Sequence, residues 1–145
     1  MEPNKKKIRV VGAAIIDSGK VLVAQRPVSD KAYKSLKWEF PGGKVEDGET
    51  EVETAIREVK EETNIDVEVD EEYRYSTKYS PKEDVIKEVI YFLARNISDN
   101  RQAQLEEVSE VKWFSMEDAI DKITYDTSRD ILIQLKQDLE KKGYM

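Results

Sequence analysis

The sequence contains no cysteine and no histidine. The missing cysteines exclude disulfides, thiolate nucleophiles and iron–sulfur clusters, and the two absences together exclude the usual zinc sites. The missing histidines also exclude Ser–His–Asp triads and histidine general bases. Proton transfer near neutral pH must therefore come from carboxylates, lysine, tyrosine or metal-bound water. Any bound metal must accept oxygen ligands, which favours Mg²⁺ or Mn²⁺.

Basic residues are outnumbered, with 24 Lys and Arg against 31 Asp and Glu and a formal net charge of −7. This balance argues against binding to a nucleic acid polymer, which requires a basic surface. A small anionic substrate is compatible with it, provided that metal ions bridge substrate and protein. The length of 145 residues suits one domain, so residues 1–145 are predicted to form a single domain.

Long apolar runs are also missing. No stretch approaches the roughly 20 apolar residues of a membrane span, so no membrane contact is expected. The lysines at 5–7 precede the apolar run Val10–Ile16, as in a signal peptide, but the run is short and Asp17 ends it without a small-residue cleavage site. A first strand is the better interpretation, and the missing cysteines agree with a cytoplasmic location.

Apolar periodicity and turn residues predict an α/β fold with a mixed sheet between helical layers. Helices are expected at Thr50–Thr63, in a short segment from Ser115, and at Thr127–Lys142, which Gly143 would cap. Pro27–Lys37 and Arg101–Ser109 are expected to be polar loops. Strands are expected at Ile8–Ile16, Val21–Gln25, Trp38–Gly43, Ile65–Val69, Tyr73–Tyr79, Val85–Ala94 and Val111–Phe114.

The helix predicted at Thr50–Thr63 has an apolar face and an acidic side. At about 100° per residue, the face expected to pack on a core consists of Val52, Ala55, Ile56 and Val59. Glu58, Glu61 and Glu62 lie together on the other side of the helix. Each like-charged pair three or four residues apart there costs a few tenths of a kcal/mol of helix stability. A solvated acidic face is the simpler explanation. A costly cluster beside a glycine turn is, however, typical of a divalent-cation site.

The turn before this helix is Pro41-Gly42-Gly43. Glycine lacks a Cβ atom, so the backbone can approach a ligand closely. An ordinary tight turn would explain a lone Pro-Gly-Gly. Because this turn comes shortly before the acidic helix in the sequence, the carbonyl of Gly43 is a candidate metal ligand.

The stretch GKVEDGETEVETAIREVKEETNI, which begins at Gly43, resembles the Nudix hydrolase signature G-x5-E-x7-R-E-U-x-E-E-x-G-U, where U is bulky and apolar. Asn64 stands where the family has glycine. This position is expected to cap the helix in a left-handed conformation, which asparagine tolerates best after glycine. The other defined positions match, and they are Gly43, Glu49, Arg57, Glu58, Val59, Glu61, Glu62 and Ile65.

The resemblance continues outside the signature. VLVAQRP at 21–27 and KWEFPGGK at 37–44 are similar to the MutT-like branch, and EVSEVKWF at 107–114 resembles a late segment of the family. The resemblance implies a Nudix-type α/β/α sandwich with a mixed β-sheet. It also implies hydrolysis of a nucleoside diphosphate linked to another group, in which water attacks a phosphorus of the pyrophosphate.

The resemblance assigns roles to the matched residues. It implies that Mg²⁺, with Mn²⁺ as an alternative, is held by Glu58, Glu61, Glu62 and the carbonyl of Gly43. It implies that Arg57 supports catalysis by pairing with Glu49, which fixes the loop against the helix. The general base stays open among Glu61, Glu62 and Glu107, with Glu106 or Glu110 as replacements for Glu107.

Substrate contacts are expected near the glycine turn. Arg26 and Lys44 could hold phosphate or be solvated charges. Trp38 or Phe40 could stack on a nucleobase, and core packing is the alternative for at least one of them. The tyrosines Tyr73, Tyr75 and Tyr79 could line a base pocket, but packing on a strand is the preferred interpretation.

The favoured function is a MutT-like pyrophosphohydrolase that converts a nucleoside triphosphate into a nucleoside monophosphate and pyrophosphate. The alternative is a dinucleoside polyphosphate hydrolase, because VIKEVIYFLA and ITYDTSRDIL are similar to that branch. A catalytically silent Nudix-like binding module and an unrelated acidic ion-binding protein are further alternatives. The expected partner is a small nucleotide, and a homodimer is compatible with the sequence.

Overall fold

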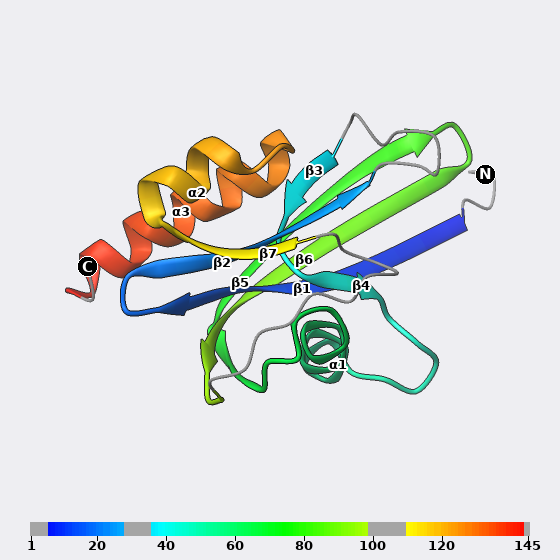
Figure 1. The fold of residues 1–145 in the computed structure, drawn as a ribbon. Coiled ribbons are helices and arrows are strands. Elements are labelled where there is room, and N and C mark those ends of the chain that lie inside the picture. Colours follow the sequence, from blue (N-terminus) through cyan, green and yellow to red (C-terminus); the bar gives the residue numbers. More distant parts are fainter. Residues whose placement is uncertain (1–5, 28–35, 99–109, 144–145) are drawn as a thin grey trace.

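A computed structural model describes residues 6–27, 36–98 and 110–143 (Figure 1). The helices are α1 (Glu51–Thr63), α2 (Met116–Lys122) and α3 (Asp126–Lys141). The strands are β1 (Lys6–Asp17), β2 (Lys20–Pro27), β3 (Leu36–Glu39), β4 (Gly42–Lys44), β5 (Val67–Lys82), β6 (Val85–Asn96) and β7 (Glu110–Ser115). The predicted loop at Arg101–Ser109 lies outside the described residues.

The described strands form a seven-stranded mixed sheet. Its central pair, β1 and β6, is parallel from Lys6 beside Val85 to Ile15 beside Ala94. The other pairings are antiparallel: β5 extends β6, β2 and β4 both pair with β1, and β3 and β7 both pair with β2. The pairing of β4 with β1 places the glycine turn at the middle of the sheet.

Helices cover both faces of the sheet, so the predicted α/β/α sandwich is confirmed. Figure 1 shows α1 on one face and α2 with α3 on the other. Between α1 and the sheet, the core contains Ala55 and Val59 with apolar side chains of β1 and β6. On the opposite side Leu132 and Leu135 pack toward the sheet with Met116. Within the described ranges, no helix is both long enough and apolar enough to span a membrane.

Strand β5 differs from the sequence prediction. The two strands expected at Ile65–Val69 and Tyr73–Tyr79 are one continuous strand that pairs with β6. The register shifts between Asp70 and Arg74, which interrupts the alternation of apolar and polar residues. A bulge inside one strand therefore looks, in the sequence, like a break between two.

Helix α1 begins and ends as its capping residues predict. Thr50 is the N-cap, and its side chain and that of Glu53 form a capping box. Asn64 ends the helix in the left-handed conformation, with φ of 61°, as expected for the residue that replaces the family's glycine. The predicted apolar face is wrong at Ile56, which is 39% exposed. The buried stripe runs instead through Ala55, Val59 and Glu62, so Ile56 lies at its edge.

Candidate active site

The glycine strand β4 lies against the carboxylates of α1. Gly42 pairs with Gly12 of β1, and the Ala13 N–H donates to the Pro41 carbonyl at 3.1 Å. A Cβ on Gly42 would lie 2.7 Å from the Gly12 Cα and 2.9 Å from the Val11 carbonyl oxygen. Glycine is therefore required here for two backbones to pack closely.

Two glutamates of α1 approach this strand from the helix. Glu62 is fully buried, and its Oε2 accepts a hydrogen bond of 2.8 Å from the Gly42 N–H. The Glu58 carboxylate occupies the space beside Gly43 that a Cβ on that residue would fill. The sequence prediction that these two glutamates face the glycine turn is therefore confirmed. Glu61 lies nearer to solvent, with 48% of its side chain exposed.

Arg57 links this cluster to the preceding loop. Its Nε donates to Glu49 Oε2 at 2.7 Å and its Nη2 to Glu49 Oε1 at 3.0 Å, so the predicted pair is present. Its Nη1 donates to Glu58 at 2.8 Å and lies 3.4 Å from both oxygens of Glu61. Its Nη2 also donates to the Lys44 carbonyl at 3.0 Å. One guanidinium thus connects the loop, the glycine strand and the helix carboxylates.

The same contacts explain the electrostatics of Glu49. Hydrogen bonds from Arg57, and next from the Thr54 hydroxyl, lower the pKa of Glu49 to about 2. Glu49 is therefore ionised throughout the physiological pH range. This ionisation keeps the bidentate pair with Arg57 intact.

The cluster fits a hard divalent cation by its donors. As they stand, no three acidic side chains among the described residues converge to hold a metal ion, because Glu58 and Glu61 are directed at Arg57 and Glu62 at Gly42. The available groups are carboxylate oxygens beside a backbone segment without side chains, and such oxygen donors suit Mg²⁺ or Mn²⁺. Glu58 and Glu61 carry these oxygens at the end of flexible side chains.

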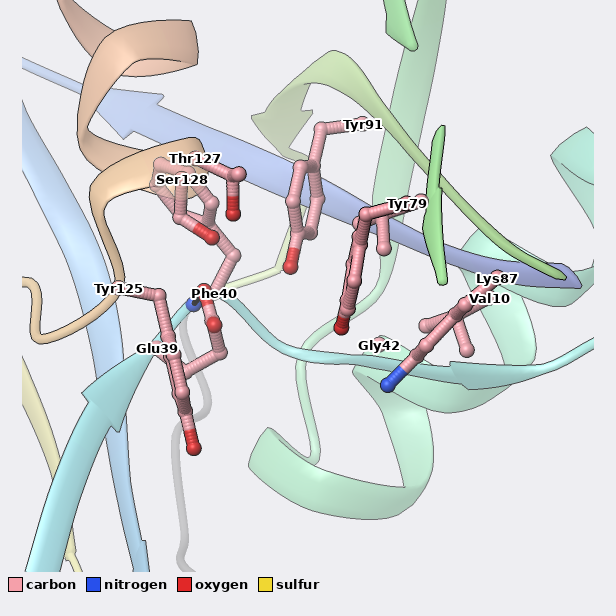
Figure 2. A pocket seen from close by; sticks show the side chains of 11 residues that line it. Val10, Glu39, Phe40, Gly42, Tyr79, Lys87, Tyr91, Tyr125, Thr127 and Ser128 are labelled. Carbon is pink, nitrogen blue, oxygen red and sulfur yellow. Dashed lines mark hydrogen bonds between the residues drawn. The ribbon is translucent and has the colours of Figure 1, made fainter. Parts of the chain in front are cut away.

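A cavity of about 230 Å³ adjoins Gly42 on the face of the sheet opposite α1 (Figure 2). Its lining residues come from β1, β3, β4, β5, β6 and the start of α3, together with Phe40 between β3 and β4. The lining residues are Val10, Glu39, Phe40, Gly42, Tyr79, Lys87, Val89, Tyr91, Tyr125, Thr127 and Ser128. Small-molecule sites are commonly partly apolar hollows with a few polar groups, as this cavity is.

The two aromatic rings predicted for base stacking are used in packing. Phe40 is 1% exposed and meets Tyr91, another lining residue, edge-on at 4.9 Å between ring centroids. Trp38 meets Phe114 edge-on at 5.4 Å and is not among the residues that line this cavity. Core packing, the alternative stated for at least one of these rings, accounts for Phe40. Trp38 is half-buried, and stacking of its ring on a base stays a prediction.

The other expected substrate and catalytic residues are only partly placed. Lys44 is exposed, and its backbone carbonyl accepts from Arg57. Arg26 pairs through its backbone with Lys37, while its side chain lies outside the described set. Glu107 and Glu106 also lie outside it, so the base assignment to the late loop stays a prediction. Glu110 begins β7.

Several polar residues of the cavity were not predicted from the sequence, among them Glu39, Lys87, Tyr125 and Ser128. Tyr79 was noted only as one member of a tyrosine series. Lys87 pairs with Tyr79 across β5 and β6, and its Nζ lies 6.0 Å from the centroid of that ring. The order of the strands, which brings these segments together, could not be read from local spacing.

Comparison with known proteins identifies the family. The NUDIX domain family matches residues 6–135. The CTP pyrophosphohydrolase of Escherichia coli is 37% identical over 117 residues, which cover 79% of this chain and 81% of that protein. The 8-oxo-dGTP diphosphatase of Proteus vulgaris is 45% identical over 65 residues, 44% of this chain and 56% of that protein.

Solved structures agree with these sequence matches. The crystal structure of a C. elegans Ap4A hydrolase binary complex superimposes with a TM-score of 0.76 at 29% identity. The superposition covers 92% of this chain and 98% of that one. The glycine strand, the arginine-linked carboxylates and these matches lead to one conclusion: the chain belongs to the NUDIX family of hydrolases.

Proposed function

We propose that this protein is a Mg²⁺-dependent nucleotide pyrophosphohydrolase that converts a nucleoside triphosphate into a nucleoside monophosphate and pyrophosphate. The observation that carries this proposal is the placement of Glu58 and Glu62 against Gly42–Gly43, with a cavity on the other side of the same turn. The pyrophosphate would then lie at the turn and the nucleoside in the cavity. The names of the two bacterial relatives support a triphosphate substrate.

Glu58, Glu61, Glu62 and the carbonyl of Gly43 would hold the cation. When bound, a divalent cation neutralises phosphate charge, orients the attacking water and lowers the pKa of that water. Arg57 keeps Glu58 beside the glycine strand, and Glu49 keeps Arg57 in place. The positive charge of the cation would allow a protein of formal charge −7 to accept an anionic substrate.

Among the three glutamates of the cluster, Glu61 suits proton acceptance from water best. Glu62 is buried and already accepts from Gly42, and Glu58 accepts from Arg57 at 2.8 Å. Glu61 is half-exposed, and its contact with Arg57 is long, at 3.4 Å. Its carboxylate can therefore turn toward a water molecule without losing a short hydrogen bond. Glu107 stays the competing candidate from the sequence.

Two exposed tyrosines suit a nucleobase in the cavity. Tyr79 is 41% exposed and Tyr125 44% exposed, and Figure 2 shows them on opposite sides of the hollow. Flat bases stack on such rings regardless of their hydrogen-bonding pattern. Lys87 and Glu39 add one cation and one carboxylate to the same walls, which can donate to and accept from base edges.

Truncating either tyrosine should weaken substrate binding more than chemistry. We expect Tyr79→Ala or Tyr125→Ala to raise KM about tenfold and to change kcat little, because stacking on a base is worth roughly 1–3 kcal/mol and acts on ground and transition states alike. Steady-state kinetics with the best triphosphate tests this. Tyr75→Phe is a control outside the site, since Tyr75 bonds Asp138 and is not among the residues that line the cavity. Unchanged KM in both alanine variants would contradict the assignment.

A dinucleoside polyphosphate hydrolase is the second candidate, and the similarity to the C. elegans Ap4A hydrolase favours it. The experiment is kcat/KM across a panel of ribo- and deoxyribonucleoside triphosphates and diadenosine tetraphosphate. We expect the best nucleoside triphosphate to have the highest kcat/KM of the panel. If diadenosine tetraphosphate exceeds every triphosphate tenfold, or by about 1.4 kcal/mol, the second candidate replaces the first. A cytoplasmic location and a homodimer stay predictions.

A further inference from the structure

Thr54 occupies one of the positions between Glu49 and Arg57 that the Nudix signature leaves undefined. Its side chain is fully buried on α1. The hydroxyl oxygen lies 2.6 Å from Glu49 Oε1 and 3.0 Å from the Thr50 carbonyl. A hydroxyl has one proton, and the shorter, charge-assisted contact is the stronger, so the proton belongs on the line to Glu49.

The Glu49 carboxylate is held at both oxygens by this arrangement. Oε1 accepts from the Thr54 hydroxyl, from the Glu46 N–H at 3.1 Å and from Arg57 Nη2. Oε2 accepts from Arg57 Nε. Thr54 approaches from the helix and Glu46 from the loop, so together they fix the plane of the carboxylate. That plane fixes the guanidinium, because the bidentate contact requires the two groups to be nearly coplanar.

The orientation of Arg57 decides where its other nitrogen points. Nη1 donates to Glu58, whose carboxylate lies beside Gly43, and Nη2 reaches the Lys44 carbonyl. Thr54 therefore stands at the start of a chain of contacts that leads through Glu49 and Arg57 to a carboxylate assigned to the cation. Groups behind metal ligands commonly set ligand orientation and metal affinity.

Thr63 shows what a buried threonine on the same helix does without this link. Its hydroxyl donates to the Val59 carbonyl at 2.7 Å and accepts from the Ile65 N–H at 3.2 Å, both of them backbone groups. It is as fully buried as Thr54. The two threonines therefore form a matched pair that differs in whether the hydroxyl reaches a side-chain carboxylate.

We propose that Thr54 is a positioning residue whose hydroxyl orients Glu49 and Arg57, and through them Glu58, for binding of the divalent cation. The part that concerns the cation rests on the proposed function. The part that concerns Arg57 does not, because the contacts among Thr54, Glu49 and Arg57 exist in the protein alone.

The first measurement is binding of Mn²⁺ alone, followed by electron paramagnetic resonance. Thr54→Val and Thr54→Ala remove the hydroxyl and should raise the Mn²⁺ dissociation constant about tenfold, the lower end of the range for groups behind metal ligands. Thr54→Ser restores a hydroxyl and should bind Mn²⁺ within about twofold of the parent. Thr63→Val should keep parental affinity, and thermal unfolding of each variant reports its loss of stability.

The second measurement is the NMR signal of the Arg57 Nε–H in the protein without metal. Thr54→Val should shift and broaden this signal, while Thr54→Ser and Thr63→Val should leave it near the parental position. Parental Mn²⁺ affinity in Thr54→Val with an unmoved Arg57 signal overturns the proposal, and so does a Thr54→Ser variant as defective as Thr54→Val. If the parent binds no Mn²⁺, the proposed function fails, while the Arg57 signal still decides the role of Thr54.

Discussion

Replacing Glu58 or Glu62 with glutamine is expected to lower kcat at least about a hundredfold, or roughly 2.7 kcal/mol, while the fold survives. Each change removes one carboxylate charge from the side of α1 that faces the glycine strand. The Glu58 carboxylate lies beside Gly43, and the Glu62 carboxylate accepts a hydrogen bond from the Gly42 N–H. A neutral amide of the same shape keeps the packing and weakens the attraction for a divalent cation.

Stability should separate these variants from simple misfolding. In Glu58→Gln the amide oxygen can still accept from Arg57 but carries no charge, so this contact weakens. The change also relieves repulsion from Glu61 and Glu62, and the two opposing terms are each a few tenths of a kcal/mol to about 1 kcal/mol. The unfolding midpoint of this variant without metal should therefore stay near the parental value or rise. The exposed Glu140→Gln serves as a control for loss of one charge. Near-parental turnover of both site variants at limiting Mg²⁺ would refute the assignment.

Adding one methyl group at Gly43 is expected to abolish activity almost as completely. A Cβ there would collide with the Glu58 carboxylate, which is the far end of a flexible side chain. The side chain can swing away at little cost to folding, so Gly43→Ala should remain folded. Glu58 would no longer lie beside the backbone of β4, and kcat should fall about a hundredfold, as for loss of the carboxylate itself.

The neighbouring glycine provides the contrast. In Gly42→Ala the new Cβ would meet backbone atoms, the Gly12 Cα at 2.7 Å and the Val11 carbonyl at 2.9 Å, and these cannot move without displacing β1. This variant should lose roughly 1–3 kcal/mol of stability. Urea unfolding and kinetics of the two variants, measured together, test the difference. If Gly43→Ala unfolds as readily as Gly42→Ala, the Glu58 side chain cannot move aside at little cost. If Gly43→Ala retains parental kcat, the close contact between Glu58 and Gly43 has no role in activity.

Local chemistry was sufficient to predict the carboxylate side of the site. The spacing of Glu58 and Glu62 on a helix follows from its periodicity, and the left-handed cap at Asn64 follows from the conformational preference of asparagine. The pairing of Arg57 with Glu49 was predicted from the family signature and is present. These features depend on residues that are close in the sequence.

The cavity could not be predicted, because residues distant in the sequence form it. Tyr79 and Lys87 meet across the β5–β6 pairing, and Tyr125 arrives from the start of α3. The burial of Phe40 also depends on a residue that is distant in the sequence. Its position beside the glycine turn suggested a ring available for stacking, yet the ring packs on Tyr91. Which aromatic rings remain exposed depends on how the layers pack, and a periodic pattern does not contain that information.

Product analysis in the presence and absence of Mg²⁺ tests the central proposal most directly. The purified protein is incubated with its best nucleoside triphosphate, and nucleotides and pyrophosphate are separated by chromatography. The account predicts one nucleoside monophosphate and one pyrophosphate for each substrate consumed, arrest of the reaction by excess chelator, and recovery when Mg²⁺ is restored. Release of a nucleoside diphosphate and phosphate, full activity in excess chelator, or no hydrolysis of any nucleotide would contradict it.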